Sequence, residues 1–170
     1  MIRYAGVISD SVVDGTGLRL VTFLQGCPRH CPGCHNPELI PFDQQKGLEI
    51  EEKEFVRLLL KRITQEHSGI TFSGGDPLMQ ADSLCAVLER LKKKKPELNV
   101  WVYTGYNFEE VRDWPVMKYI DVLVDGPFVE QKKDLGLAFR GSSNQRIIDV
   151  PKSLAQKGRV VEIKLGVQSA

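Results

Sequence analysis

The sequence has 170 residues, of which 42% are hydrophobic and 26% are charged, and its formal net charge at pH 7 is +1. This length predicts one domain, spanning residues 1–170, with a buried core. A nearly neutral chain lacks the basic excess that attracts nucleic acid or an anionic membrane, so the composition argues against both kinds of partner. The N-terminus lacks the pattern of a signal peptide, and no apolar run approaches the ~18 residues that span a bilayer, which predicts a cytoplasmic protein.

The first predicted elements are a strand and a helix. The stretch Leu18–Gly26, LRLVTFLQG, is short, apolar and β-branched and ends in glycine, which is typical of a strand that leads into a loop. From Glu51 onward, apolar residues recur at helical spacing, with acidic residues in the first turn and basic residues later. The apolar face of this predicted helix carries Phe55, Leu58, Leu59 and Ile63.

Strands and helical patterns then alternate along the chain. The remaining predicted strands are Ile70–Ser73, Asn99–Gly105 and Tyr119–Gly126. A second amphipathic helix carries the apolar stripe Ala81, Leu84, Leu88 and Leu91, and a short helix covers residues 107–114. Strands that are separated by helices pair in parallel through right-handed crossovers, so the alternation predicts an α/β fold.

A complete eight-unit barrel needs about 250 residues, so this chain is long enough for only part of one. We therefore expect a partial, open parallel β/α barrel with helices on its outer face. The loops at residues 26–36, 73–77 and 103–105 each lie at the carboxyl end of a predicted strand. Loops at the carboxyl ends of parallel strands lie at the same edge of the sheet, where ligands bind, and we expect these three to converge there.

The loop GCPRHCPGCHN contains Cys27, Cys31 and Cys34. Clustered cysteines in a reducing compartment favour metal binding or catalysis over disulfides, and thiolates at this spacing suit zinc or an iron–sulfur cluster. Gly26 lets the backbone approach a bulky centre closely. Cys85 falls beside the stripe of the second helix, where we expect a small buried apolar residue and no ligand.

Three kinds of site remain open for this cysteine loop. In a zinc-binding interaction module, His30 or His35 could complete a tetrahedral site, although structural zinc sites usually have a second ligand pair that is missing here. A ferredoxin-like electron carrier needs four thiolates for its cluster. The third alternative is a four-iron cluster that three thiolates leave incompletely ligated, so that one iron can bind a substrate or a cofactor directly.

The C-x3-C-x2-C motif of Cys27, Cys31 and Cys34 resembles that of the radical S-adenosylmethionine enzymes. In that family the open iron of a [4Fe–4S] cluster is chelated by the amino and carboxylate groups of S-adenosylmethionine. The reduced cluster then splits this cofactor and releases a 5′-deoxyadenosyl radical, so the cofactor carries the radical chemistry. The resemblance implies both cofactors and no catalytic side chain.

The stretch SGGDP, Ser73–Pro77, resembles the Gly-Gly-Glu-Pro loop whose backbone holds the methionyl ammonium in the same family. Asp76 replaces the more frequent glutamate and would add negative charge near that ammonium. Gly33 stands where many members have an aromatic residue, so the adenine contact would come from the backbone around Gly33 or from another side chain. The resemblance assigns cofactor binding to Gly33, Cys34, His35, Ser73, Gly74, Gly75 and Asp76.

Longer stretches resemble the activases of glycyl radical enzymes, and among them the branch that acts on anaerobic ribonucleoside-triphosphate reductase. These stretches are residues 14–19, 26–38, 70–78, 100–106, 122–128 and 139–149. The resemblance implies that the radical takes a hydrogen atom from a glycine of the reductase, with an electron donor of the flavodoxin or ferredoxin type. Another glycyl radical enzyme, such as pyruvate formate-lyase, is the alternative substrate. A protein substrate would also cover an open barrel mouth that has no lid domain of its own.

Overall fold

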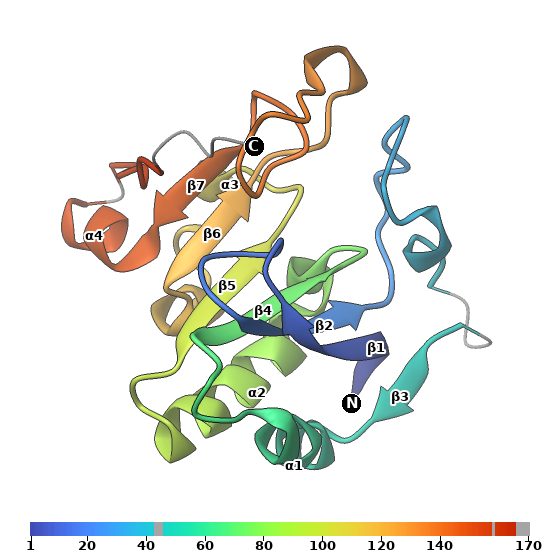
Figure 1. Ribbon diagram of the computed structural model, residues 1–170, viewed down its shortest axis with the longest axis vertical. Coiled ribbons are helices and arrows are strands. Elements are labelled where there is room, and N and C mark those ends of the chain that lie inside the picture. The colour runs from blue at the N-terminus through green and yellow to red at the C-terminus, as the bar shows by residue number, and fades with distance from the viewer. Residues whose placement is uncertain (43–45, 158, 166–170) are drawn as a thin grey trace.

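The protein folds as a seven-stranded sheet with helices against it, in a computed structural model that describes residues 1–42, 46–157 and 159–165 (Figure 1). The strands are β1 (Ile2–Ser11), β2 (Arg19–Leu24), β3 (Leu48–Ile50), β4 (Gly69–Gly74), β5 (Asn99–Tyr103), β6 (Val122–Asp125) and β7 (Arg146–Asp149). The helices are α1 (Glu52–Arg62), α2 (Ala81–Lys94), α3 (Phe108–Val111) and α4 (Val150–Ala155). Short 3-10 helices span Pro37–Leu39, Pro77–Gln80, Pro115–Tyr119 and Glu130–Lys132.

The centre of the sheet is parallel and its edges are antiparallel. The strand order is β3-β1-β2-β4-β5-β6-β7, and the four predicted strands β2, β4, β5 and β6 pair in parallel, which confirms the α/β prediction. The expectation of a wholly parallel sheet is wrong at the edges, where β1 pairs antiparallel with β2 and β3, and β7 pairs antiparallel with β6. The segments 12–18 and 126–145, both fully described, contain no α-helix, whereas parallel neighbours are usually joined through one.

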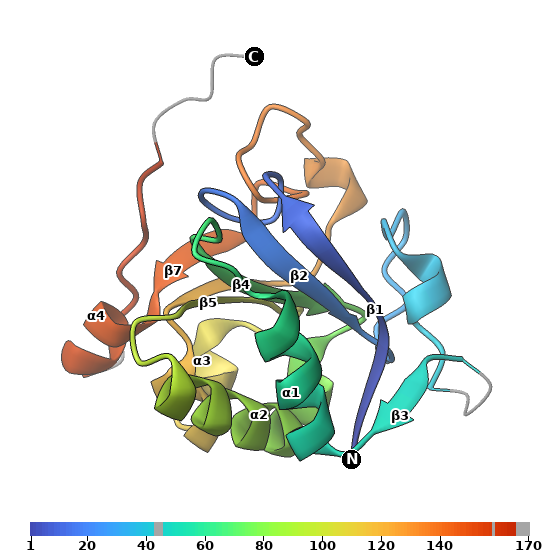
Figure 2. The ribbon, with the colours of Figure 1, turned by 60° about the horizontal axis from the view of Figure 1, so that its bottom comes forward.

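Helices α1 and α2 lie side by side on one face of the sheet (Figure 2). Their predicted apolar stripes face the core, and Phe55, Leu59, Leu84 and Leu88 are fully buried there. Ile63 packs against this core but follows the C-terminal end of α1, where the backbone is already extended. None of the helices in the described part of the chain has the length and apolar composition that crossing a membrane requires.

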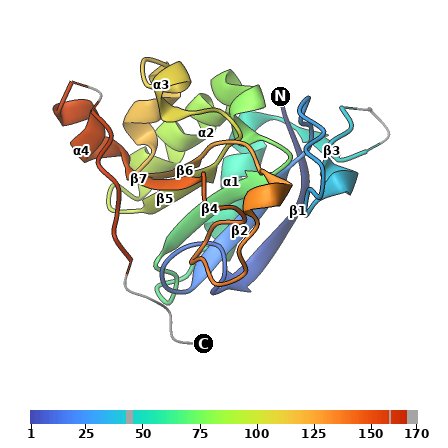
Figure 3. The same cartoon turned by 90° about the horizontal axis from the view of Figure 1, so that it is seen from above.

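The other face of the sheet carries a smaller apolar cluster that includes Trp101, Val122, Val124 and Ile147. The loop between β1 and β2 and the long segment between β6 and β7 lie next to each other over this side (Figure 3). The helices and the long loops thus occupy opposite faces, and the ends of the central strands open toward the loops.

Candidate functional site

The loops that follow β2, β4 and β5 border one pocket of about 670 Å³. Parallel strands end at the same edge, so the backbone brings together three loops that are far apart in the sequence. The predicted site residues that line this pocket are Cys27, Cys31, Cys34, His35, Ser73, Gly74, Gly75 and Asp76. Gly33 is exposed at the tip of the cysteine loop and is not among the lining residues. The expected convergence of the three loops is therefore confirmed.

The cysteine loop is fastened at its start. The Gly26 amide donates to the Leu39 carbonyl at 2.7 Å, and the Cys27 amide donates to the Ile40 carbonyl at 2.9 Å. Further along, the Cys34 amide donates to the Cys31 carbonyl at 3.1 Å. The three cysteines are free thiols of intermediate exposure. Among the residues that the structure describes, no three His, Cys, Asp or Glu side chains lie close enough together to hold a single metal ion.

The chemistry of this donor set fits an iron–sulfur cluster, because such clusters are held by cysteine thiolates that come from one short segment. Burial raises the pKa of the Cys27 thiol above its ordinary value, and hydrogen bonds from Arg29 act in the opposite direction. Binding to a metal centre requires the thiolate, so loading of the site would release the Cys27 proton.

The Gly-Gly-Asp loop packs directly on the start of the cysteine loop, backbone against backbone. The Gly75 amide donates to the Leu24 carbonyl, and the Asp76 amide donates to the Gly26 carbonyl, both at 2.9 Å. A Cβ atom at Gly75 would lie 2.4 Å from the Gly26 oxygen, closer than side chains are found. Gly74 has a φ of +115°, which favours glycine. These glycines are therefore required by the fold, whatever ligand they bind.

The Asp76 carboxylate is 1% exposed and is held by groups of the protein itself. Its oxygens accept hydrogen bonds from the Thr104 hydroxyl at 2.9 and 3.1 Å, and from the amides of Gly105 and Leu78 at 3.0 Å each. The Arg29 guanidinium forms a salt bridge with the same carboxylate. Burial raises the pKa of Asp76, while these hydrogen bonds and the charge of Arg29 counteract the rise. The carboxylate thus has protein partners on both oxygens.

Arg29 and Tyr106 were not predicted as site residues. Arg29 lies between the first two cysteines, and its guanidinium carbon lies 4.2 Å from the centroid of the Tyr106 ring. The interaction of Asp76 with Arg29 raises the pKa of the arginine despite its partial burial. A basic residue inside a metal-binding loop is a visible signal, but its partners come from the loops after β4 and β5, so only the tertiary structure identifies them.

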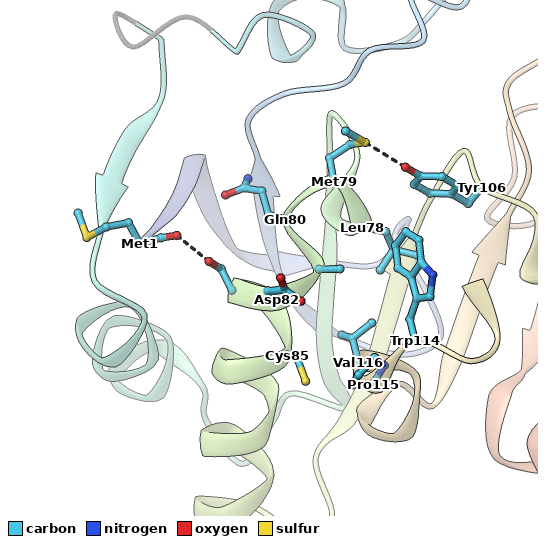
Figure 4. A pocket seen from close by; sticks show the side chains of 12 residues that line it. Met1, Leu78, Met79, Gln80, Asp82, Cys85, Tyr106, Trp114, Pro115 and Val116 are labelled. Atoms are coloured by element: carbon cyan, nitrogen blue, oxygen red, sulfur yellow. Dashed lines mark hydrogen bonds between the residues drawn. The ribbon is translucent and has the colours of Figure 1, made fainter. Parts of the chain in front are cut away.

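Cys85 lies away from this pocket, and it is half-buried where a buried residue was predicted. It packs against the core on α2 and lines a second pocket of about 570 Å³, together with Met79, Trp114 and Val116 (Figure 4). Tyr106 also lines this second pocket, and its hydroxyl donates to the Met79 sulfur at 3.3 Å.

Another arginine–aspartate pair lies at the end of β6. The Asp125 carboxylate is fully buried and accepts hydrogen bonds from Arg146 at 2.6 and 3.1 Å and from the Phe108 amide at 2.8 Å. Arg146 also binds both oxygens of Glu109, at 2.8 and 3.0 Å. None of these side chains lines the 670 Å³ pocket. The pair joins β6, β7 and α3 and contributes to the scaffold.

Comparisons with known proteins agree with this site. A family model described as a 4Fe–4S single cluster domain matches residues 13–148. The anaerobic ribonucleoside-triphosphate reductase-activating protein of Haemophilus influenzae is 33% identical over 150 residues, which cover 86% of this chain and 97% of that protein. The protein of the same name from Vibrio cholerae is 39% identical, covering 80% and 90%, and that of the phage T4 is 30% identical, covering 86% and 93%.

Among solved structures, QueE from Escherichia coli has a similar fold, with a TM-score of 0.50 over 61% of this chain and 52% of QueE. The two sequences are 14% identical over the match, so the likeness concerns the fold alone. The family match covers both the cysteine loop and the Gly-Gly-Asp loop, and the relatives match over most of their length. The chain therefore belongs to the family of anaerobic ribonucleoside-triphosphate reductase-activating proteins, with a 4Fe–4S single cluster domain.

Proposed function

We propose that Cys27, Cys31 and Cys34 hold a [4Fe–4S] cluster and that the adjoining pocket binds S-adenosylmethionine. The observation that carries this proposal is that the three cysteines and the Gly-Gly-Asp loop line one pocket. Its volume of about 670 Å³ lies within the range of ~300–1,000 Å³ that is usual for small-molecule sites. Three thiolates on four irons leave one iron without a protein ligand, and that iron is where the cofactor would bind.

The two ends of S-adenosylmethionine would meet different parts of the pocket. Backbone carbonyls of Ser73, Gly74 and Gly75 would accept hydrogen bonds from the methionyl ammonium, since glycines leave these oxygens uncovered. The adenine end would lie near His35 and Phe128, whose ring centroids are 5.7 Å apart. This aromatic pair supports a role for the segment from Gly33 to His35, although Gly33 carries no ring of its own.

Held by Cys27, Cys31 and Cys34, the cluster would supply the electron for reductive cleavage of S-adenosylmethionine, and the resulting 5′-deoxyadenosyl radical would take a hydrogen atom from the Cα of a glycine in the partner protein. The task of the chain itself is to hold the cofactor in one place and to keep water away. Tyr103, Phe128 and Phe139 line the pocket and provide apolar surface for that purpose.

The proposed substrate is a glycine of anaerobic ribonucleoside-triphosphate reductase, which the names of the relatives indicate. Val12 and Val13 line the pocket and are 66% and 71% exposed, and Leu135 is 86% exposed on the segment that contributes Leu137 to the pocket. Apolar side chains exposed around an opening are typical of protein contact sites. They support a macromolecular substrate that covers the pocket during the reaction.

We also propose a one-electron donor of the flavodoxin or ferredoxin type and a cytoplasmic location, where free cysteines persist. For the sheet we propose the geometry of a partial, open β/α barrel. The apolar cluster around Trp101 on the face away from α1 and α2 supports this proposal, because it would fill the inner side of such a barrel.

The test is activation of the reductase under anaerobic conditions. Reduced, iron-loaded protein is mixed with S-adenosylmethionine and the reductase, and electron paramagnetic resonance is recorded. We expect the doublet of a glycyl radical with the reductase and none with pyruvate formate-lyase under the same conditions. A doublet only with pyruvate formate-lyase would favour the alternative substrate. Protein that is colourless and binds one zinc per chain would contradict the proposed function altogether.

A further inference from the structure

Arg29, Asp76, Met79 and Tyr106 form a closed ring of contacts beside the pocket. Arg29 forms a salt bridge with Asp76, and its guanidinium stacks on the ring of Tyr106. The Tyr106 hydroxyl donates to the Met79 sulfur at 3.3 Å (Figure 4). Met79 belongs to the short helix that Asp76 caps by accepting a hydrogen bond from the Leu78 amide. Each member is thus held from two sides, and the ring joins the loops that follow β2, β4 and β5.

The geometry around the ring leaves little freedom to Arg29. A Cβ atom at Gly105 would lie 2.7 Å from Arg29 Cδ, so the absence of a side chain at Gly105 makes room for the arginine. Tyr106 is fixed further by Trp114, whose ring centroid lies 5.2 Å away in an edge-to-face arrangement. A planar guanidinium can pair with a carboxylate and stack on an aromatic ring at the same time, which a lysine cannot do equally well.

We propose that Arg29 and Asp76 act together as a positioning pair that locks the cysteine loop to the Gly-Gly-Asp loop and so sets the position of the cluster relative to S-adenosylmethionine. The inference rests on the proposed function. In this arrangement the Asp76 carboxylate binds Arg29, Thr104 and Gly105, and the methionyl ammonium would bind backbone carbonyls instead. The charge of Asp76 is therefore used inside the protein, in contrast to the direct ligand contact that the sequence motif implies.

The first test uses protein without its cluster, so that it does not depend on the cofactors. Amide hydrogen exchange is compared between the wild type, Arg29→Gln and Arg146→Gln, which breaks the other buried arginine–aspartate pair. We expect Arg29→Gln to accelerate exchange in residues 27–36 and 104–106 by about tenfold, because one lost interaction changes local opening to that degree. Arg146→Gln should leave these segments unchanged. Equal exchange in the wild type and Arg29→Gln would overturn the proposal.

The second test measures the affinity for S-adenosylmethionine through the change that it causes in the electron paramagnetic resonance spectrum of the reduced cluster. The variants are Arg29→Gln, Asp76→Asn and the double variant, compared at equal iron content. If the two residues act as one pair, each single change weakens binding by about tenfold and the double change is no worse than either. Arg29→Lys should recover only part of the affinity, because lysine keeps the charge but loses the planar stack.

The alternative is that Asp76 contacts the ammonium directly. In that case Asp76→Asn alone weakens binding, Arg29→Gln has no effect, and the proposal is overturned. Additive effects of the two changes would overturn it as well, since additivity means independent roles. If Arg29→Gln cannot be loaded with iron, Arg29→Lys replaces it, and its affinity for S-adenosylmethionine is compared with that of Asp76→Asn. Wild-type protein that holds iron but binds no S-adenosylmethionine would refute the proposed function, while the exchange experiment would still decide whether the two loops are locked.

Discussion

Two buried aspartates, each paired with an arginine, lie at the carboxyl ends of central strands and serve different purposes. In the inner pair, Asp76 follows β4, lines the pocket and binds Arg29 from the cysteine loop. In the outer pair, Asp125 ends β6, lies outside the pocket and binds Arg146 from β7. The same chemical pair therefore joins two loops that border the pocket in one place and two elements of the scaffold in the other. The position on the sheet, and not the residue types, decides which role such a pair has.

The largest effect should follow from removing the cluster, which the inner pair is proposed to position. Cys31→Ala leaves two thiolates in the loop, and clusters of this kind depend on their thiolate ligands. We expect the variant to lose the brown colour and to cleave S-adenosylmethionine at no more than about 1% of the wild-type rate, a loss of roughly 3 kcal/mol of transition-state stabilisation. Iron content and the 5′-deoxyadenosine formed are measured together. Cys85→Ala is the control and should retain both, because Cys85 lies on α2 in another pocket.

The outer pair should matter for stability. Arg146→Gln leaves the Asp125 carboxylate buried without its ion-pair partner, and breaking such pairs lowers the free energy of unfolding by about 3 kcal/mol. Chemical denaturation of cluster-free protein measures this loss, with the exposed Arg90→Gln as control. The affinity of loaded protein for S-adenosylmethionine should stay the same. A large loss of affinity at unchanged stability would mean that the two pairs do not differ as described.

The close approach of Gly105 to Arg29 allows a third test, in which a side chain is added next to the inner pair. Gly105→Ala places a methyl group against Arg29 Cδ, which must move, and we expect about tenfold weaker binding of S-adenosylmethionine. Gly6→Ala is the matched control, because a Cβ atom at Gly6 meets nothing within 4 Å. Spectroscopic titration of the reduced cluster measures both variants. Equal affinities for the two would show that Arg29 does not need the space at Gly105.

The smallest effect concerns Glu109, which also binds Arg146 of the outer pair. Its hydrogen bonds with Arg146 hold the pKa of Glu109 below the ordinary value. A lowered carboxyl pKa contributes stability that is present above the pKa of the unfolded chain and is lost as the pH falls through the folded value. Glu109 is half exposed, so this contribution should be small. As the pH falls below ~4.5, we expect the free energy of unfolding to drop further in the wild type than in Glu109→Gln, by less than about 1 kcal/mol. Denaturation at pH 6 and at pH ~3.5 tests this, and identical losses would contradict it.

The parts of the fold that could be predicted from the sequence are those with regular patterns. The strands β2, β4, β5 and β6 are short apolar runs, and α1 and α2 have clear stripes, so both types were recognised. The strands β1, β3 and β7 were missed. β1 is interrupted by two register shifts, β3 has three residues with Leu48 exposed, and β7 has four residues. Such edge strands gain their structure from pairing and carry little pattern of their own.

The site could be predicted as far as the loops that line it. Cysteine spacing and the glycines after β4 are local signals, and parallel topology predicts that they meet. The partners of Asp76 could not be predicted, because Arg29 and Thr104 come from other loops, and the pairing depends on the depth of burial. For the same reason the sequence assigned the charge of Asp76 to a ligand, whereas the fold surrounds it with protein donors.

The proposed site leaves one iron of the cluster free to bind S-adenosylmethionine. Electron–nuclear double resonance on the reduced protein, with S-adenosylmethionine labelled with nitrogen-15 at the amino group and carbon-13 at the carboxylate, tests it most directly. We predict resolved couplings from both labels, which require direct contact of these groups with the cluster. A saturated complex that shows neither coupling would mean that S-adenosylmethionine does not bind the open iron.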